Sequence, residues 1–177
     1  MNLEVIEFET APNPTASVIV LHGLGADGND FVPVAKMMDA GVAVRYVFPS
    51  APVMPVTINN GYEMRAWYDI RTGDLTQRED EGGLRSSMAA IDGLITREME
   101  RGIPADKIVL MGFSQGCAMT LMTGLRHPNR LAALIGLSGY LPVADKTAAE
   151  RNPANQNTPI FMAHGKVDPV VPFERAV

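Results

Sequence analysis

Cysteine is almost absent from this chain: among its 177 residues only Cys117 carries a thiol. A single cysteine can form neither an internal disulfide nor a zinc site built from several thiolates. We therefore expect no metal site of this kind and a reducing compartment, which in most cells means the cytoplasm. Cys117 itself is expected to be a buried packing residue.

Positive charge and long apolar segments are also scarce. Lys and Arg total 15 against 20 Asp and Glu, giving a net charge of −5, so the basic stripe of a nucleic-acid-binding protein is missing. The first residues, MNLEVIE, lack the basic-then-apolar layout of a signal peptide. The longest uncharged run, residues 108–125, is near the length of a membrane helix, but the polar segment GFSQG interrupts it. We expect no nucleic-acid partner and no integral membrane association.

What is present is enough apolar sequence for one core, with 46% hydrophobic and 20% charged residues. Apolar runs alternate with helical patterns, which predicts a single α/β domain over residues 1–177 with a mostly parallel sheet. Asp30 and Asp145 are expected near helix starts as caps. Residues 49–83 are expected to form a long irregular excursion. The expected strands are residues 3–9, 17–21, 42–48, 107–111, 132–137 and 159–163, and the expected helices are residues 31–38, 84–101, 114–125 and 144–151.

A glycine loop, HGLGADG at residues 22–28, follows the second expected strand and contains G-x-G-x-x-G. A dinucleotide-binding loop would need an acidic residue about 20 positions later. No Asp or Glu lies between Gly41 and Tyr62, which counts against a nicotinamide-dependent oxidoreductase. The rival interpretation is an oxyanion loop, in which glycine lets the backbone approach the substrate.

The segment GFSQG at residues 112–116 matches G-x-S-x-G between an apolar strand and a helix. This context places Ser114 on the sharp turn where α/β-hydrolases carry their nucleophile. The backbone N–H groups of Gln115 and Leu24 are the expected oxyanion donors. A plain strand-to-helix turn remains the alternative.

A serine nucleophile needs a base and an acid that orients it. Asp168 follows the last expected strand and is the expected acid, with Asp145 as its competitor. The base should come after the acid, yet the three histidines are His22, His127 and His164, and none follows Asp168. The expected triad therefore has two members in this chain.

Three motifs together resemble the carboxylesterase and acyl-protein thioesterase family of small serine hydrolases: LHGLG at 21–25, GFSQG at 112–116, and HGKVDPVVP at 164–172. The segment PVTINNGYEMRAWYDI at 55–70 is very similar to bacterial carboxylesterases of this group. The resemblance implies an α/β-hydrolase fold with helices on both faces of the sheet and no cofactor. It implies hydrolysis of short to medium acyl esters or thioesters, with Ser114 as nucleophile, Asp168 as acid, and Leu24 and Gln115 as oxyanion donors.

The family's catalytic histidine lies beyond the acid, after a further helix and strand. We therefore expect the domain to be incomplete at its C-terminus, lacking the last strand and helix, and the catalytic histidine to be absent.

Ile58, Tyr62, Met64 and Trp67 are candidate walls of an acyl pocket, although they fit core positions equally well. The leading function is a serine carboxylesterase that forms an acyl-Ser114 intermediate. An acyl-protein thioesterase or lysophospholipase-like hydrolase and an impaired acyl-ligand-binding form are the alternatives; a homodimer is compatible with these features but not required by them.

Overall fold

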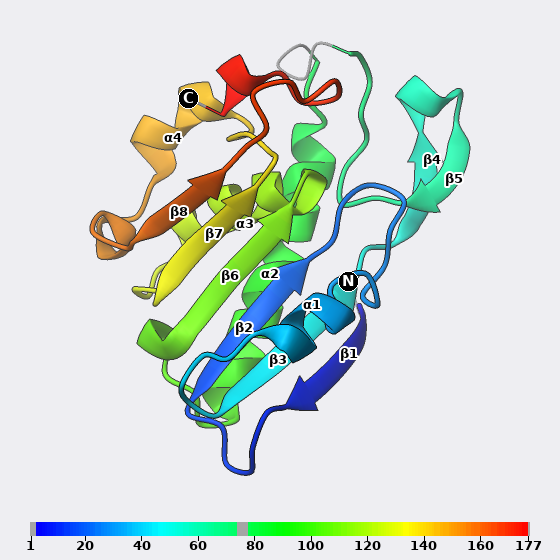
Figure 1. Ribbon diagram of the computed structural model, residues 1–177. Helices are drawn as coiled ribbons and strands as arrows, with labels where there is room; N and C mark the ends of the chain where they lie inside the picture. Colours follow the sequence, from blue (N-terminus) through cyan, green and yellow to red (C-terminus); the bar gives the residue numbers. More distant parts are fainter. Residues whose placement is uncertain (1–2, 74–77, 177) are drawn as a thin grey trace.

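The computed structural model contains a six-stranded sheet whose strands lie in the order β1-β3-β2-β6-β7-β8 (Figure 1). The structure describes residues 3–73 and 78–176. β1 pairs antiparallel with β3, and all other neighbouring strands of this sheet are parallel. The mostly parallel α/β sheet predicted from the sequence is thus confirmed. The strands are Glu4–Glu9 (β1), Ala16–Leu21 (β2), Val44–Ser50 (β3), Ile108–Phe113 (β6), Ala133–Leu137 (β7) and Ile160–Ala163 (β8).

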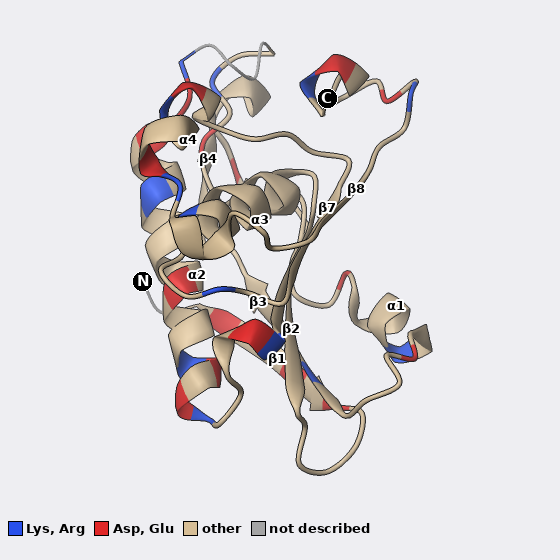
Figure 2. Cartoon of the chain, turned by 90° about the vertical axis from the view of Figure 1, so that its left-hand side faces the viewer, with Lys and Arg blue, Asp and Glu red and all other residues tan. Residues whose placement is uncertain are grey.

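Helices cover both faces of the sheet (Figure 2). α2 and α3 lie on one face and the short α1 on the other. In the described part of the chain no helix is both long enough and apolar enough to span a membrane. The helices are Val32–Met37 (α1), Glu81–Glu100 (α2), Gln115–Arg126 (α3) and Ala144–Glu150 (α4).

The central strand β2 shows why its sequence is a continuous apolar run. Ile19 and Leu21 point into the larger core, where they pack with residues of α2 and α3. Val20 points to the opposite face and joins a smaller cluster with Ala35 of α1 and Phe48 of β3. Successive side chains of a strand face opposite sides, so a strand covered on both faces is apolar throughout.

The segment expected to be irregular contains a second, small sheet. β4 (Val53–Val56) and β5 (Tyr62–Arg65) form an antiparallel hairpin, joined by a 3-10 turn at Thr57–Asn59. The positive φ angles of Asn60 and Gly61, 55° and 76°, complete the reversal. The prediction of irregular structure here was therefore wrong in part, because residues 53–56 pair as a strand with residues 62–65. Part of the predicted excursion, residues 74–77, lies outside the described residues.

Two predicted helix caps are also wrong. α1 begins after Phe31, and no side chain caps it; Pro33, whose fixed φ suits a helix, lies in its first turn, and Asp30 is not the cap. α4 begins after Val143, which has a left-handed conformation, and no side chain caps it either. Asp145 lies exposed in the first turn of α4, where a carboxylate interacts favourably with the helix dipole without capping.

Candidate active site

Ser114 lies at the turn between β6 and α3, as the G-x-S-x-G motif predicts. Its φ of 54° and ψ of −116° fall in a region that L-residues rarely adopt. The strained turn is held by the Ser114 N–H, which donates to the carbonyl of Leu137 in β7 at 2.8 Å. Because α3 begins at Gln115, the serine faces the positive end of a helix dipole.

The two motif glycines allow this turn to close. A Cβ at Gly112 would lie 2.1 Å from the carbonyl oxygen of Gly116. A Cβ at Gly116 would lie 2.0 Å from the carbonyl oxygen of Leu21, at the end of β2. Both obstacles are backbone atoms, which cannot rotate away as a side chain can. Only glycine therefore fits at these two positions.

The glycine loop after β2 lies directly beside the serine. A Cβ at Gly23 would be 3.4 Å from the Cβ of Ser114. Leu24 comes next in the chain. Within the described residues the structure shows no acceptor for the backbone N–H of Leu24 or for that of Gln115, the first residue of α3. Two unpaired N–H groups next to a serine are the arrangement that stabilises an oxyanion.

A small cavity of about 70 Å³ opens at this point. It brings Ser114, Leu24 and Gln115 together, as the sequence analysis expects of a nucleophile and its oxyanion donors. The remaining lining residues were not predicted, although the rule that α/β sites lie beyond the carboxyl ends of parallel strands points to the loops after β7 and β8. These additional residues are Tyr68, Ile70, Tyr140, Val170 and Val171.

Two of the lining residues form a buried hydroxyl pair. The hydroxyl oxygens of Tyr68 and Tyr140 lie 2.9 Å apart. Burial raises the pKa of Tyr68 well above its ordinary value and that of Tyr140 to about 12. Both tyrosines are therefore neutral at physiological pH, and their rings give the cavity an aromatic side.

Asp168 lies in the loop after β8, and its loop reaches the cavity through Val170 and Val171. The Asp168 Oδ1 atom accepts hydrogen bonds from the backbone N–H groups of Val170, at 2.9 Å, and Val171, at 3.0 Å. These bonds, that of Val171 first, lower the pKa of Asp168, so the carboxylate is charged at neutral pH. Neither Asp168 nor its competitor Asp145 is itself a lining residue of the cavity; Asp168 is the nearer in sequence to lining residues, two positions before Val170.

None of the histidines occupies the position of a base toward Ser114. His22 is buried, its Nδ1 donates to the carbonyl of Gly23 at 2.7 Å, and its Nε2 accepts from the N–H of Ala51 at 2.9 Å. With both ring nitrogens bonded, it has none left to take a proton from the serine. His127 is buried 4.0 Å from Asp92, with its Nδ1 at the backbone of Asn129.

His164 stands nearest in sequence to Asp168, at the end of β8. Its Nδ1 donates to the carbonyl of Gly165 at 3.0 Å, and its ring meets the edge of Phe173. It does not line the cavity beside Ser114. Both contacts lie within the C-terminal segment that carries Asp168.

None of the four candidate pocket residues lines the cavity at Ser114. Ile58 and Tyr62 belong to the β4–β5 hairpin region and are exposed, and Met64 is half-buried in β5. Trp67 is 1% exposed and part of the larger core. Of the two alternatives left open by the sequence, Trp67 therefore takes the core position.

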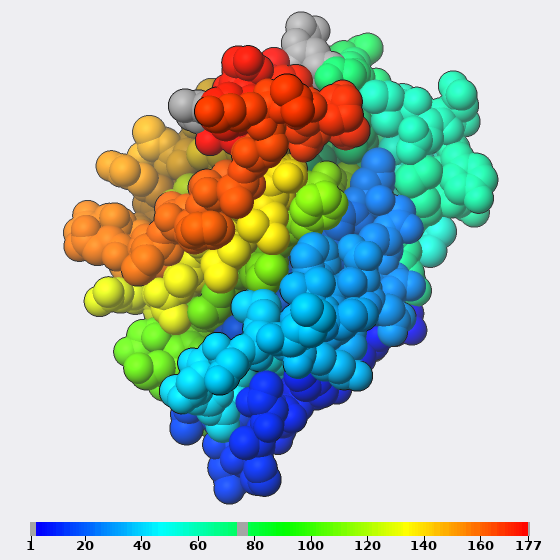
Figure 3. All heavy atoms as spheres, viewed as in Figure 1, coloured from blue at the N-terminus to red at the C-terminus, as the bar shows by residue number. Residues whose placement is uncertain are grey.

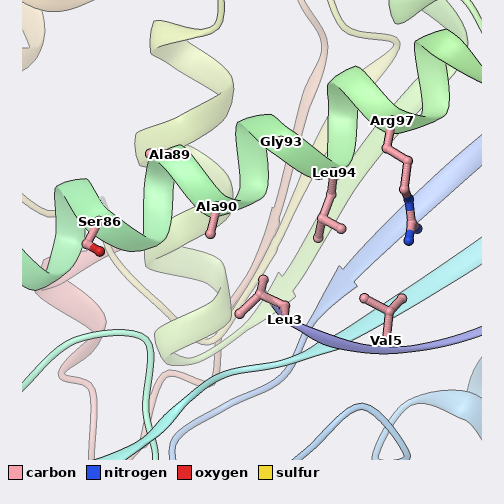
Figure 4. Close-up of a pocket in the computed structure, with 8 residues that line it drawn as sticks. All are labelled: Leu3, Val5, Ser86, Ala89, Ala90, Gly93, Leu94 and Arg97. Carbon is pink, nitrogen blue, oxygen red and sulfur yellow. The ribbon is translucent and has the colours of Figure 1, made fainter. Parts of the chain in front are cut away.

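A larger hollow of about 410 Å³ lies between α2 and the start of β1 (Figure 4). Its lining is dominated by small and aliphatic side chains, together with Ser86 and Arg97. Arg97 is occupied by an ion pair with Glu7. The lining residues of this hollow include no side chain that could act as a base for the Ser86 hydroxyl, so the small cavity at Ser114 is the candidate catalytic site.

The fold, the strained serine turn and the adjoining loop define an α/β-hydrolase. The family model described as Phospholipase/Carboxylesterase matches residues 1–177. The chain belongs to this family and is a serine hydrolase.

Curated relatives support the same family. Acyl-protein thioesterase 1 of Yarrowia lipolytica is 40% identical over 164 residues, covering 90% of this chain and 72% of the relative. Acyl-protein thioesterase 1 of Schizosaccharomyces pombe is 42% identical over 158 residues, covering 89% of this chain and 70% of the relative.

Solved structures agree in fold. The crystal structure of Arabidopsis thaliana SOBER1 is 30% identical with a TM-score of 0.85, covering 90% of this chain and 78% of that one. Acyl-protein thioesterase 2 of Zea mays is 28% identical with a TM-score of 0.79, covering 96% of this chain and 80% of that one.

Proposed function

We propose that this chain cleaves small acyl esters through an acyl-Ser114 intermediate. The observation that carries the proposal is that Ser114, Leu24 and Gln115 line one cavity, and that among the described residues no acceptor is shown for the backbone N–H of Leu24 or of Gln115. The Ser114 Oγ attacks the acyl carbonyl, its proton passes to a base, and the two N–H groups stabilise the oxyanion. The alcohol then leaves with a proton, and water releases the acid from the serine.

In this proposal Asp168 is the acid that orients a base. Its Oδ1 is held by two backbone N–H groups, and its charge is maintained at neutral pH. None of the three histidines supplies the base, so the 177-residue chain should turn over slowly. A serine hydrolase that lacks one triad member retains only about 10³–10⁴-fold acceleration over water, from its oxyanion hole and substrate binding.

Exogenous imidazole provides the sharpest test. Hydrolysis of p-nitrophenyl acetate should rise with imidazole concentration and saturate with substrate, because the added base takes the proton from Ser114. The Ser114→Ala variant supplies the background, including hydrolysis by imidazole itself. Equal rates for the native chain and Ser114→Ala at every imidazole concentration would refute the proposal.

Thioester hydrolysis is the second candidate, favoured by the relatives that are named acyl-protein thioesterases. Matched O-acyl and S-acyl substrates with the same acyl group separate the two activities under the same imidazole conditions. A third outcome, stoichiometric binding of the acyl compound with no product release, would identify an impaired acyl-ligand-binding form. The lone, buried thiol of Cys117 supports a cytoplasmic setting for any of these activities.

A further inference from the structure

The two oxyanion donors come from segments that are far apart in the chain. Leu24 belongs to the loop after β2, whereas Gln115 begins α3. An oxyanion hole is effective only when its donors are already aimed at the position where charge develops. Something must therefore hold these two segments at a fixed separation, and the covalent chain between them is too long to do so.

Trp67 contacts both segments. Its indole Nε1–H donates to the carbonyl of His22, two residues before Leu24, at 2.9 Å. Its backbone N–H donates to the side-chain Oε1 of Gln115, also at 2.9 Å. The same Gln115 side chain donates through Nε2 to the carbonyl of Tyr68 at 2.7 Å. One tryptophan thus bridges the two donor segments by direct hydrogen bonds.

Both ends of this bridge are rigid. Trp67 is 1% exposed, and its carbonyl accepts a hydrogen bond from the hydroxyl of Ser87 in α2. His22 is fixed on the other side, because Gly23 accepts from its Nδ1 and Ala51 donates to its Nε2. Those two bonds require the neutral tautomer with the proton on Nδ1. Hydrogen bonds shielded from water in this way resist exchange with solvent.

We propose that Trp67 is a positioning residue, which sets the separation of the Leu24 and Gln115 oxyanion donors through its two hydrogen bonds. It does not line the cavity and so has no contact with the substrate. This assignment rests on the proposed function of the site.

The experiment uses the fact that Trp67 is the single tryptophan of the chain. Biosynthetic replacement of tryptophan by 3-benzothienylalanine changes this residue alone and puts sulfur in place of Nε1–H while keeping the bicyclic shape. Imidazole-assisted kcat should fall about 10- to 100-fold, up to the loss that follows a misplacement of about 1 Å, with KM within about twofold of native. Trp67→Phe, which also lacks the indole N–H, is a second variant that can be made by ordinary mutagenesis.

A second measurement separates positioning from a loss of stability. A boronic acid forms a tetrahedral adduct with Ser114, and its dissociation constant should rise about tenfold or more in the 3-benzothienylalanine protein. Ser17→Ala is the matched control: it removes a buried hydrogen bond to the Arg45 carbonyl at the far end of β2 and should change neither kcat nor boronate affinity. A folded analogue with native kcat and native boronate affinity would overturn the role of Trp67.

The proposed function fails separately from this inference. Loss of all Ser114-dependent turnover and adduct formation in the native chain would overturn both. Turnover and adduct formation that depend on Ser114 but are indifferent to the indole N–H would overturn the inference alone.

Discussion

The α-carbon of Gly116 lies directly against the carbonyl of Leu21, so that a Cβ at position 116 would sit 2.0 Å from that oxygen. This contact joins the start of α3 to the end of β2, and the loop that carries Leu24 leaves from that same strand end. The nucleophile turn and the oxyanion loop are therefore neighbours because two backbones touch where no side chain intervenes.

Gly116→Ala should consequently destabilise the chain by about 3 kcal/mol or more, at the upper end of overpacking penalties, because neither backbone can yield. Thermal or urea unfolding measures the loss. Gly93→Ala is the control: a Cβ there meets nothing within 4 Å in the middle of α2. That variant should gain about 0.5–1 kcal/mol from helix propensity. Similar effects at the two positions would contradict the proposed contact.

The elements that could be predicted are those whose signals are local. The apolar run of β2 and the periodic pattern of α2 gave the parallel sheet and its covering helix, since each depends on the residues of one segment. G-x-S-x-G placed Ser114 because the strained turn between a strand and a helix demands small neighbours at 112 and 116. The glycine loop at residues 22–28 is also a local signal, and it predicts that Leu24 lies close to Ser114.

Features that depend on distant partners were missed. Tyr68 and Tyr140 are far apart in the chain, and neither segment contains a sign that their hydroxyls meet at 2.9 Å. The position of Trp67 is equally ambiguous, because a large aromatic residue suits a pocket wall and a core alike. Its two hydrogen bonds decide the matter, and they exist only once β2, α3 and the segment after β5 are assembled.

Glu98 should be one of the most costly charges to remove. It is 0% exposed, and its carboxylate pairs with Arg45 at 3.0 Å and with Arg101 at 2.9 Å. Glu98→Gln keeps the shape but leaves the largely buried Arg45 less compensated, so we expect a loss of about 3 kcal/mol in the free energy of unfolding. Chemical denaturation measures it.

Glu4→Gln is the control for this prediction. The Glu4 carboxylate also pairs with an arginine, Arg65, at 2.7 Å, but its side chain is 70% exposed. Screening by water limits such a pair to less than about 1 kcal/mol. Comparable losses for the two variants would mean that burial of Glu98 does not strengthen its pairing.

His22 should make stability depend on pH near neutrality. Burial lowers the pKa of His22 below its ordinary value of 6.5. The unfolded chain therefore takes up a proton near pH 6.5 while the folded chain still resists it, and stability falls as pH decreases through this window. The slope cannot exceed about 1.4 kcal/mol per pH unit.

The comparison for this effect is His22→Gln, whose amide can both donate and accept but does not titrate. Urea unfolding at pH 7.5, 6.5 and 5.5 should show the native chain losing more stability than the variant on acidification. The carboxylates titrate alike in both proteins, so their contribution to the pH dependence of stability cancels in the comparison. A stability difference that stays constant over this range would show that His22 is not held neutral by the fold.

Cys117 should be unreactive in the folded state. Burial raises the pKa of its thiol to about 12, and the thiolate is the reactive form. Ellman's reagent should modify it only as fast as the chain unfolds, so the rate should climb with urea concentration across the unfolding transition. Rapid modification without denaturant would disprove the buried packing role.

The edge of the main sheet at β8 should promote self-association. Within the described residues β8 pairs only with β7, and Ile160 and Phe161 are 46% and 60% exposed. The atoms of this region lie open on the face shown in Figure 3. An apolar strand with unpaired backbone groups is a template for a further strand.

Phe161→Lys should weaken concentration-dependent association at least about tenfold in sedimentation velocity, because edge lysines oppose pairing. Val53→Lys, equally exposed at 60% but on the β4–β5 hairpin, should leave association unchanged. A native chain that remains monomeric at about 100 µM, or equal effects of the two lysines, would show that β8 is not the contact.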